Sequence, residues 1–207
     1  MAKTVKLAKE HGARIGAHPG FSDLFGFGRR PIQTTPEDIY NFVFYQIGAL
    51  EGFCRLHNQT MQHVKPHGAL FNMAAVDSAM SEAIAKAVKD ANPNLVLFGL
   101  AGSELTKAGE KYGLKTANEV FADRTYQPDG TLTPRTSANA LITDHEQAVQ
   151  QVLQMVTTST VTAVDGSTIP MEADTVCVHG DGEHALLFVK ELRNHLTKND
   201  IEIASIL

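Results

Sequence analysis

The sequence lacks several features that would place it in a protein class at once. It has no tryptophan, only 2 cysteines in 207 residues, and no Gly-rich nucleotide fingerprint of the GxxxxGK[ST] or GxGxxG type. No apolar run approaches the ~20 residues that span a bilayer. There is no block of basic residues, and the formal net charge is −5. We therefore expect neither a membrane nor a nucleic acid as partner, because binding to a phosphate backbone needs a cationic surface.

The scarcity of cysteine also bears on the cellular compartment. Cys54 falls in a helical pattern and Cys177 in a strand pattern, so both are expected to be buried, free thiols. Two isolated cysteines beside 9 histidines indicate a reducing compartment rather than a disulfide framework. The opening stretch MAKTVKLAKEHG alternates charged and apolar residues and has no signal-peptide core. We expect a cytoplasmic protein.

Strand and helix patterns alternate along the chain, which predicts an α/β protein with a parallel sheet. Thr35 is a plausible N-cap for a long helix, with Pro36 at its first position. Asp165-Gly166 between β-branched runs predicts a small hairpin. Helices are expected over 1–12, 34–58, 77–93, 103–113, 143–156 and 182–196. Strands are expected within 13–20, 60–68, 94–102, 114–124, 173–181 and 201–207.

Residues capable of chemistry follow four of these strands at their carboxyl ends, as in a (β/α) barrel. An open doubly wound sheet would concentrate them at one switch point instead. We therefore predict a TIM-like (β/α) barrel forming one domain over 1–207. Each βα unit of such a barrel takes roughly 30 residues, and this chain opens in a helix with no strand before it. We therefore expect that one or two leading βα units of the barrel are missing from it.

The stretch HVKPHG, residues 63–68, is the most unusual local pattern. His63 and Lys65 are two apart and share one face of a strand, Pro66 ends that strand, and His67 lies just beyond it. A protonated lysine opposes a dication and favours an anion such as a carboxylate or phosphate. For His63, packing in the core is an equally good interpretation. For Lys65 and His67, a functional role is favoured.

Other strand ends add candidate groups, each with a structural alternative. His18 could merely cap the Pro-Gly turn that follows it. Asp123 and Arg124 could form a structural ion pair, and Asp181 could cap a glycine turn near His179. Arg29 and Arg30 follow a Gly-rich loop, where arginines commonly clamp anions, although one is expected to make only a surface ion pair.

Seven blocks of the chain together resemble the LamB/YcsF family, the A subunit of bacterial ATP-dependent 5-oxoprolinase. They run in the family's order from residue 10 to residue 181: EHGARIGAHPGF, GFGRRP, YQIGAL, HVKPHGALFNMA, GLAGSEL, EVFADRTYQPDGTL and DTVCVHGD. The resemblance implies a barrel of the glycoside hydrolase/deacetylase type. It also implies a family pattern that begins with two further strands before the helix where this chain starts.

The resemblance implies a cytoplasmic complex with partner subunits B and C that opens the lactam of 5-oxo-L-proline to L-glutamate while hydrolysing ATP, with Mg as its companion ion. Which subunit binds ATP stays open, as does a homo-oligomer. The matched positions imply an active-site lining of His18, Lys65, His67, Asp123, Arg124, His179 and Asp181.

Roles for these residues are hypotheses from their chemistry. The candidate catalytic residues are Lys65, His67, Asp123, His179 and Asp181, and the candidate substrate- or anion-binding residues are His18, Arg29, Arg30, His63 and Arg124. One alternative is a metal-dependent amide hydrolase or deacetylase, whose ligands would be His18, His67, His179 and Asp181. A second is a non-catalytic scaffolding subunit, which the many polar strand ends disfavour.

Overall fold

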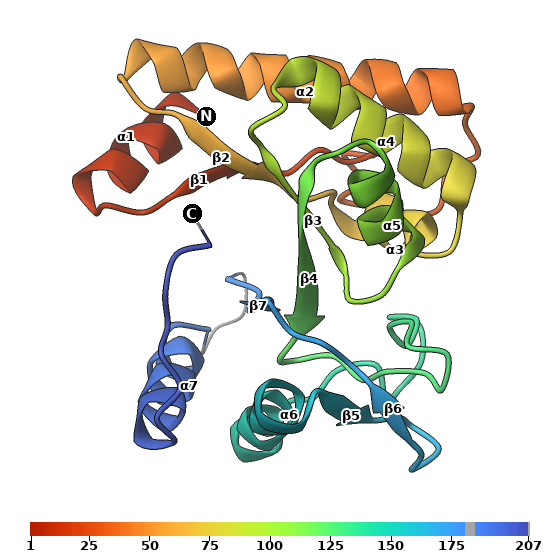
Figure 1. Cartoon of the computed structure of the whole chain (residues 1–207), viewed down its shortest axis with the longest axis vertical. Coiled ribbons are helices and arrows are strands. Elements are labelled where there is room, and N and C mark those ends of the chain that lie inside the picture. The colour runs from red at the N-terminus through yellow and green to blue at the C-terminus, as the bar shows by residue number, and fades with distance from the viewer. Residues whose placement is uncertain (181–184, 207) are drawn as a thin grey trace. The chain divides into compact units, whose positions relative to one another are not determined.

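The computed structural model describes residues 1–180 and 185–206, and the chain divides into two compact units, residues 1–117 and 118–207. Figure 1 traces the elements in chain order. The predicted α/β class is confirmed by parallel strand pairs in both units. The single barrel domain over 1–207 stays a prediction.

The first unit has parallel strands and helices. Its elements are α1 (Ala2–Glu10), β1 (Ile15–Ala17), α2 (Pro36–Leu56), β2 (Met61–Val64), α3 (Gly68–Ala74), α4 (Ser78–Ala91), β3 (Val96–Leu100) and α5 (Glu104–Lys111). Strand β2 pairs in parallel with β1 and with β3. The hydroxyl of Thr35 accepts a hydrogen bond from the Asp38 amide, which confirms the predicted cap of α2 and contributes about 1 kcal/mol. The apolar faces of α2 and α4 pack in one core cluster with the strands.

Helix α3 lies between the strand expected within 60–68 and the helix expected over 77–93, where the sequence pattern predicts no helix. It is only seven residues long, and its Leu70 and Phe71 side chains are buried. So short a helix gains little from backbone propensity alone, and burial of its apolar face stabilises it.

The second unit contains the hairpin and the C-terminal elements. They are α6 (His145–Thr158), β5 (Thr160–Thr162), β6 (Thr168–Pro170), β7 (Thr175–Cys177) and α7 (Ala185–Lys198), while β4 (Lys115–Phe121) crosses the boundary between the units. Strands β4 and β7 pair in parallel, and β5 pairs antiparallel with β6. The predicted hairpin is confirmed, with Gly166 at φ 85° in its turn.

Two expectations need correction. Residues 201–206 form no strand, and Ile203 and Ile206 are exposed, so the alternating IEIASI pattern finds no strand partner within the described chain. Cys54 is a buried free thiol, as predicted, whereas Cys177 is free and only half-buried. No helix among the described residues is long and apolar enough to cross a membrane.

The close contact between β1 and β2 depends on a missing side chain at Gly16. Gly16 pairs in register with His63, whose ring stacks on Phe98 at a centroid distance of 4.4 Å. A Cβ atom at Gly16 would lie 2.1 Å from Nε2 of His63. Glycine at this position therefore makes room for the imidazole.

We predict that Gly16→Ala lowers the free energy of unfolding by about 1–3 kcal/mol, because the His63 ring must move out of a packed site. Gly48→Ala in α2 is the matched control. Its new Cβ meets nothing within 4 Å, and helical alanine is favoured over glycine by roughly 0.5–1 kcal/mol. Urea denaturation of the three proteins measures both changes. Equal stability of the Gly16 variant and the wild type would contradict the packing described for His63.

Candidate active site

Two histidines of the first unit meet just beyond the carboxyl ends of β1 and β2. The register pairs Ala17 with Val64, so His18 and Lys65 are the next residues on neighbouring strands. Nδ1 of His18 lies 2.7 Å from the Lys65 carbonyl oxygen. Nε2 of His18 lies 2.9 Å from Nδ1 of His67, and Nε2 of His67 lies 2.7 Å from the Phe27 carbonyl oxygen. The four ring nitrogens thus form one chain between two carbonyls.

This row of hydrogen bonds determines how many protons the two histidine rings carry. A carbonyl oxygen only accepts, so Nδ1 of His18 and Nε2 of His67 must both carry hydrogen. If both rings were neutral, the two inner nitrogens would face each other as lone pairs at 2.9 Å. A hydrogen bond between them needs a third proton. The pair therefore carries one positive charge, which suits an anionic ligand.

A braced loop holds the Phe27 carbonyl against His67. The Asp23 side chain accepts from the Gly26 amide at 2.9 Å and forms an ion pair with Arg30. That guanidinium lowers the pKa of the buried Asp23 carboxyl to about 2. Phe27 adopts a left-handed conformation at φ 54°, which is uncommon for an aromatic residue. The loop is thus ordered by its own contacts.

The two arginines of this loop have different partners. Arg30 is committed to Asp23, which is the structural ion pair expected of one of the two. Arg29 lies over the Phe27 ring, with its guanidinium carbon 5.1 Å from the ring centroid. An anion-binding role stays a prediction for Arg29.

The histidine pair borders a hollow of about 440 Å³. Its lining includes His18, Phe21, Phe27, Phe42, Gln46 and His67. Gln46, a polar residue on the otherwise apolar face of α2, accepts from the Gly20 amide at 3.1 Å and donates to the Gly20 carbonyl at 2.9 Å. It thereby fixes the turn that follows His18. The hollow combines a cationic pair with aromatic walls and can accommodate a small, partly apolar anion.

His63 and Lys65 have different surroundings. Burial, and to a lesser extent the nearby Lys65 charge, lowers the pKa of His63. Its ring is stacked on Phe98, which suits the packing interpretation, and an anion-binding role stays a prediction. Lys65 is half-buried, and its amide donates to the Ala17 carbonyl at 2.9 Å. Lys65 stays a candidate.

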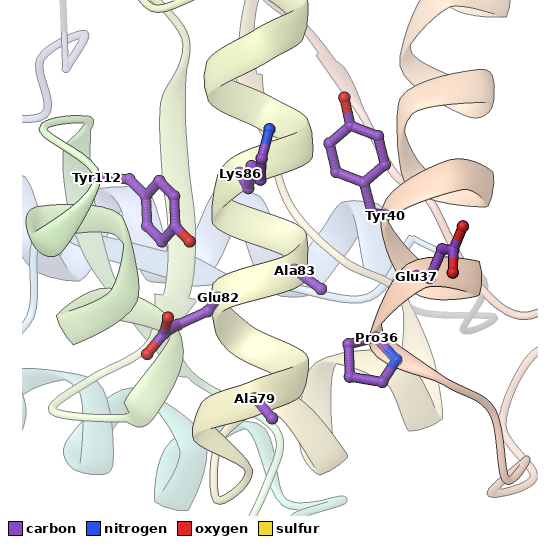
Figure 2. A pocket seen from close by; sticks show the side chains of 8 residues that line it. All are labelled: Pro36, Glu37, Tyr40, Ala79, Glu82, Ala83, Lys86 and Tyr112. Atoms are coloured by element: carbon purple, nitrogen blue, oxygen red, sulfur yellow. The ribbon is translucent and has the colours of Figure 1, made fainter.

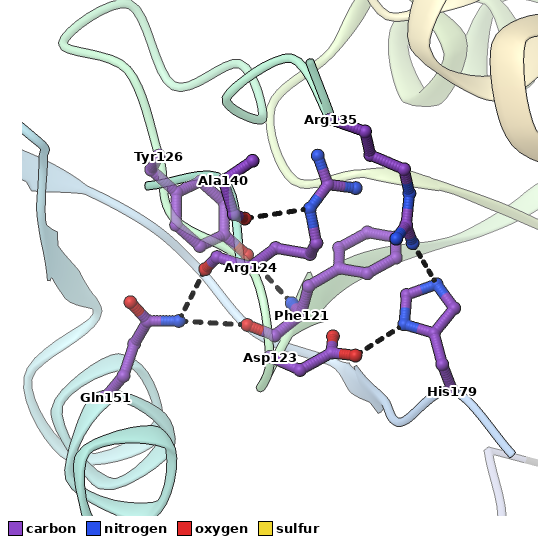
Figure 3. Close-up of polar contacts among 8 residues, drawn as sticks. All are labelled: Phe121, Asp123, Arg124, Tyr126, Arg135, Ala140, Gln151 and His179. Atoms are coloured by element: carbon purple, nitrogen blue, oxygen red, sulfur yellow. Dashed lines mark hydrogen bonds and ion pairs between the residues drawn. The ribbon is translucent and has the colours of Figure 1, made fainter. Parts of the chain in front are cut away.

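A second polar group lies within the other unit, at the ends of β4 and β7 (Figure 3). The register pairs Phe121 with Cys177, so Asp123 and His179, each two residues further on, meet. The Asp123 carboxylate oxygen Oδ2 lies 2.7 Å from Nδ1 of His179. On the other side of the ring, Nη2 of Arg135 lies 3.1 Å from Nε2.

These neighbours fix the tautomer of His179. A guanidinium only donates and a carboxylate only accepts, so Nε2 accepts from Arg135 and Nδ1 donates to Asp123. His179 is therefore a neutral ring with its proton on Nδ1 and its lone pair on Nε2. The Asp123 carboxylate thereby orients the imidazole ring. The arrangement can take a proton at Nε2.

Arg124 is buried and holds the backbone that follows β4. Its guanidinium donates to the carbonyls of Ala140 (3.2 Å) and Thr133 (2.5 Å). Gln151 of α6 donates to the carbonyls of Phe121 and Arg124. These contacts give Arg124 a structural role, and an anion-binding role for it stays a prediction.

Asp181, a candidate base, lies outside the described residues. The sequence alone does not point to Arg135, because this residue sits in a long polar loop after Pro134 with no strand pattern next to it. Among residues 1–180 and 185–206, no three His, Cys, Asp or Glu side chains are grouped to hold a metal ion.

Another hollow, of about 550 Å³, lies on the helical surface of the first unit (Figure 2). Its lining consists of Pro36, Glu37, Tyr40, Ala79, Glu82, Ala83, Lys86 and Tyr112. Lys86 forms an ion pair with Asp90, and Glu82 accepts from Lys111 at 2.7 Å. Because these charges have partners and the lining comes from helices and their ends, we assign no chemistry to it.

Comparison with known proteins places these residues in a family context. The model of the LamB/YcsF family matches residues 1–207. The chain is 63% identical over 206 residues to the 5-oxoprolinase A subunit of Halalkalibacterium halodurans, covering 100% of this chain and 80% of the relative. It is 58% identical to the 5-oxoprolinase A subunit of Bacillus subtilis strain 168, with the same coverage.

A solved structure agrees with the fold. The lactam utilization protein from Thermus thermophilus is 40% identical and superposes with a TM-score of 0.90, over 99% of this chain and 82% of that one. This likeness confirms the predicted α/β, TIM-like barrel class.

We predict a pH-dependent contribution of Asp23 to stability. Its pKa is lower in the folded chain than in the unfolded chain, so its contribution is complete above about pH 4 and disappears as the pH falls towards 2. Asp23→Asn should therefore be less stable than the wild type at pH 7, and the difference should shrink below pH 4. Urea denaturation from pH 3 to 7 measures the difference, and a constant difference throughout would contradict the Asp23–Arg30 brace.

Proposed function

Because the chain belongs to the LamB/YcsF family, we propose that it acts as the A subunit of an ATP-dependent 5-oxoprolinase. The observation that carries this proposal is 54–63% identity to relatives named as the 5-oxoprolinase A subunit, over almost the whole of this chain. The complex, which includes partner subunits B and C and is expected in the cytoplasm, opens 5-oxo-L-proline to L-glutamate and hydrolyses ATP. ATP, with Mg, is its co-substrate.

The reaction requires three kinds of functional group in the active site. A lactam is an unreactive amide, so ATP transfers its phosphoryl group to the lactam oxygen and makes the ring carbon electrophilic. Water adds to that carbon, the C–N bond breaks as the nitrogen takes up a proton, and a second water hydrolyses the resulting acyl phosphate to the carboxylate. The steps require contacts to anions, a base for water and an acid for the nitrogen.

The side chains of the first unit fit the binding of an anion. The His18–His67 pair carries one positive charge, and the hollow beside it has aromatic walls that suit the methylene groups of a five-membered ring. We assign one anionic group of the substrates, either the 5-oxoproline carboxylate or a phosphoryl group, to this pair together with Lys65. This charge also makes His67 a candidate acid for the departing nitrogen.

The side chains of the second unit fit a general base. Nε2 of His179 carries a lone pair, and Asp123 stabilises the positive charge that the ring gains on taking a proton from water. We assign His179 as the base and Asp123 as the residue that orients it. Asp181 stays a candidate base from the sequence.

The metal-dependent hydrolase is a less favoured alternative. Two of its four predicted ligands, His18 and His67, direct nitrogens at each other 2.9 Å apart, with a proton between them. His179 directs one nitrogen at Asp123 and the other at Arg135. We derive no step through a metal from the described residues.

We predict that the chain, mixed with purified B and C subunits, converts 5-oxoproline to glutamate only when ATP is present. Glutamate and ADP are measured together. Glutamate formation that needs no ATP would select the amide hydrolase instead. No turnover with an active B and C preparation would contradict the proposal.

Replacement of one lysine separates catalysis from scaffolding in the same assay. Lys65→Met should abolish turnover and leave the circular dichroism spectrum unchanged. Lys107→Met is the control, because this lysine sits on α5 in a surface ion pair with Glu104. Full activity of the Lys65 variant would remove Lys65 from the reaction, and full activity with His179→Asn as well would favour a scaffolding role.

A further inference from the structure

Arg135 is the residue of the second unit whose role the proposed function leaves unexplained. It is exposed, yet the backbone around it is held in place. The Thr133 amide donates to the Thr125 carbonyl at 3.0 Å, and the Ser137 amide donates to the Pro134 carbonyl at 2.9 Å. Arg124 holds the same segment from inside through its bonds to Thr133 and Ala140. The loop therefore delivers Arg135 to a defined position.

The contact that Arg135 makes with His179 is a weak use of a guanidinium. Nη2 donates to the neutral lone pair on Nε2 of His179 (Figure 3). The donor of this bond is charged but its acceptor is neutral, whereas a guanidinium can hold a carboxylate or phosphate with two parallel bonds between opposite charges. An incoming anion therefore competes well with the His179 lone pair for Arg135. The same contact also occupies the lone pair that the reaction needs.

We propose that Arg135 binds the anionic group of a substrate beside His179 and, in doing so, releases Nε2 to accept a proton from water. The anion is a carboxylate, from 5-oxoproline, or a phosphoryl group, from ATP or the phosphorylated lactam. Anion binding would then free the base only when a substrate is in place. This inference rests on the proposed function and adds a residue to it.

Steady-state kinetics of the complex with B and C tests the role of Arg135. Arg135→Ala should raise the KM for the substrate whose anion it binds by on the order of 10- to 150-fold, the loss expected for hydrogen bonds to a charged group, and should lower kcat. Arg135→Lys keeps the charge but not the fork, so we expect a change several times smaller than that of Arg135→Ala. A rise in the KM for 5-oxoproline alone identifies the carboxylate, and a rise in the KM for ATP alone identifies the phosphoryl group.

Chemical rescue separates binding from a structural role. Millimolar methylguanidinium should restore part of the activity of Arg135→Ala, because it can occupy the vacated position, and should leave Arg135→Lys unchanged. Arg193→Ala, an exposed arginine of α7 in the same unit, is the matched control and should behave as the wild type. If Arg135→Ala does not fold, Arg135→Lys carries the test.

The outcomes distinguish this inference from the proposed function. Wild-type kinetics for both Arg135 variants in an active complex would overturn the role of Arg135 and leave the 5-oxoprolinase assignment intact. Reduced activity with unchanged KM values and no rescue would also overturn it, in favour of a structural role. A wild-type complex without 5-oxoprolinase activity would remove both.

Discussion

Backbone carbonyls and carboxylates can only accept hydrogen bonds, and guanidinium groups can only donate them. In this chain these restrictions determine which ring nitrogens of three histidines carry protons. His18 and His67 are each bound to a carbonyl at one nitrogen, so they share three protons and one positive charge. His179 lies between a carboxylate and a guanidinium and is neutral, with its lone pair on Nε2. One cationic pair and one base follow from the same rule.

Strand register brings these groups together in both units. The pairing of Ala17 with Val64 places His18 next to Lys65, and the pairing of Phe121 with Cys177 places Asp123 next to His179. Each polar side chain begins where a parallel strand ends, so its position is set by the backbone ladder rather than by a flexible loop. Gly16 leaves room for the His63 ring beside β1. The Gln46 side-chain amide accepts a hydrogen bond from the Gly20 amide in the turn after β1.

The sequence allowed prediction of the features that depend on local pattern. Alternating strand and helix periods, the Thr35 cap, the hairpin and the polar strand ends were all visible in it. Partners that meet only through folding were not visible. Arg135 is 44 residues from His179 and lies in a polar loop, and Arg124 donates to the carbonyls of Ala140 and Thr133, 16 and 9 residues further along the chain. The pattern of 201–206 resembles a strand, yet pairing depends on a neighbouring strand and not on the pattern itself.

Nitrogen-15 NMR of the histidine side chains tests proton placement most directly, because protonated and unprotonated ring nitrogens have well-separated chemical shifts. At neutral pH the account predicts a proton on Nδ1 and none on Nε2 of His179, and three protons on the four ring nitrogens of His18 and His67. Replacing each histidine in turn assigns the signals. A proton on Nε2 of His179, or only two protons on the His18–His67 pair, would contradict it.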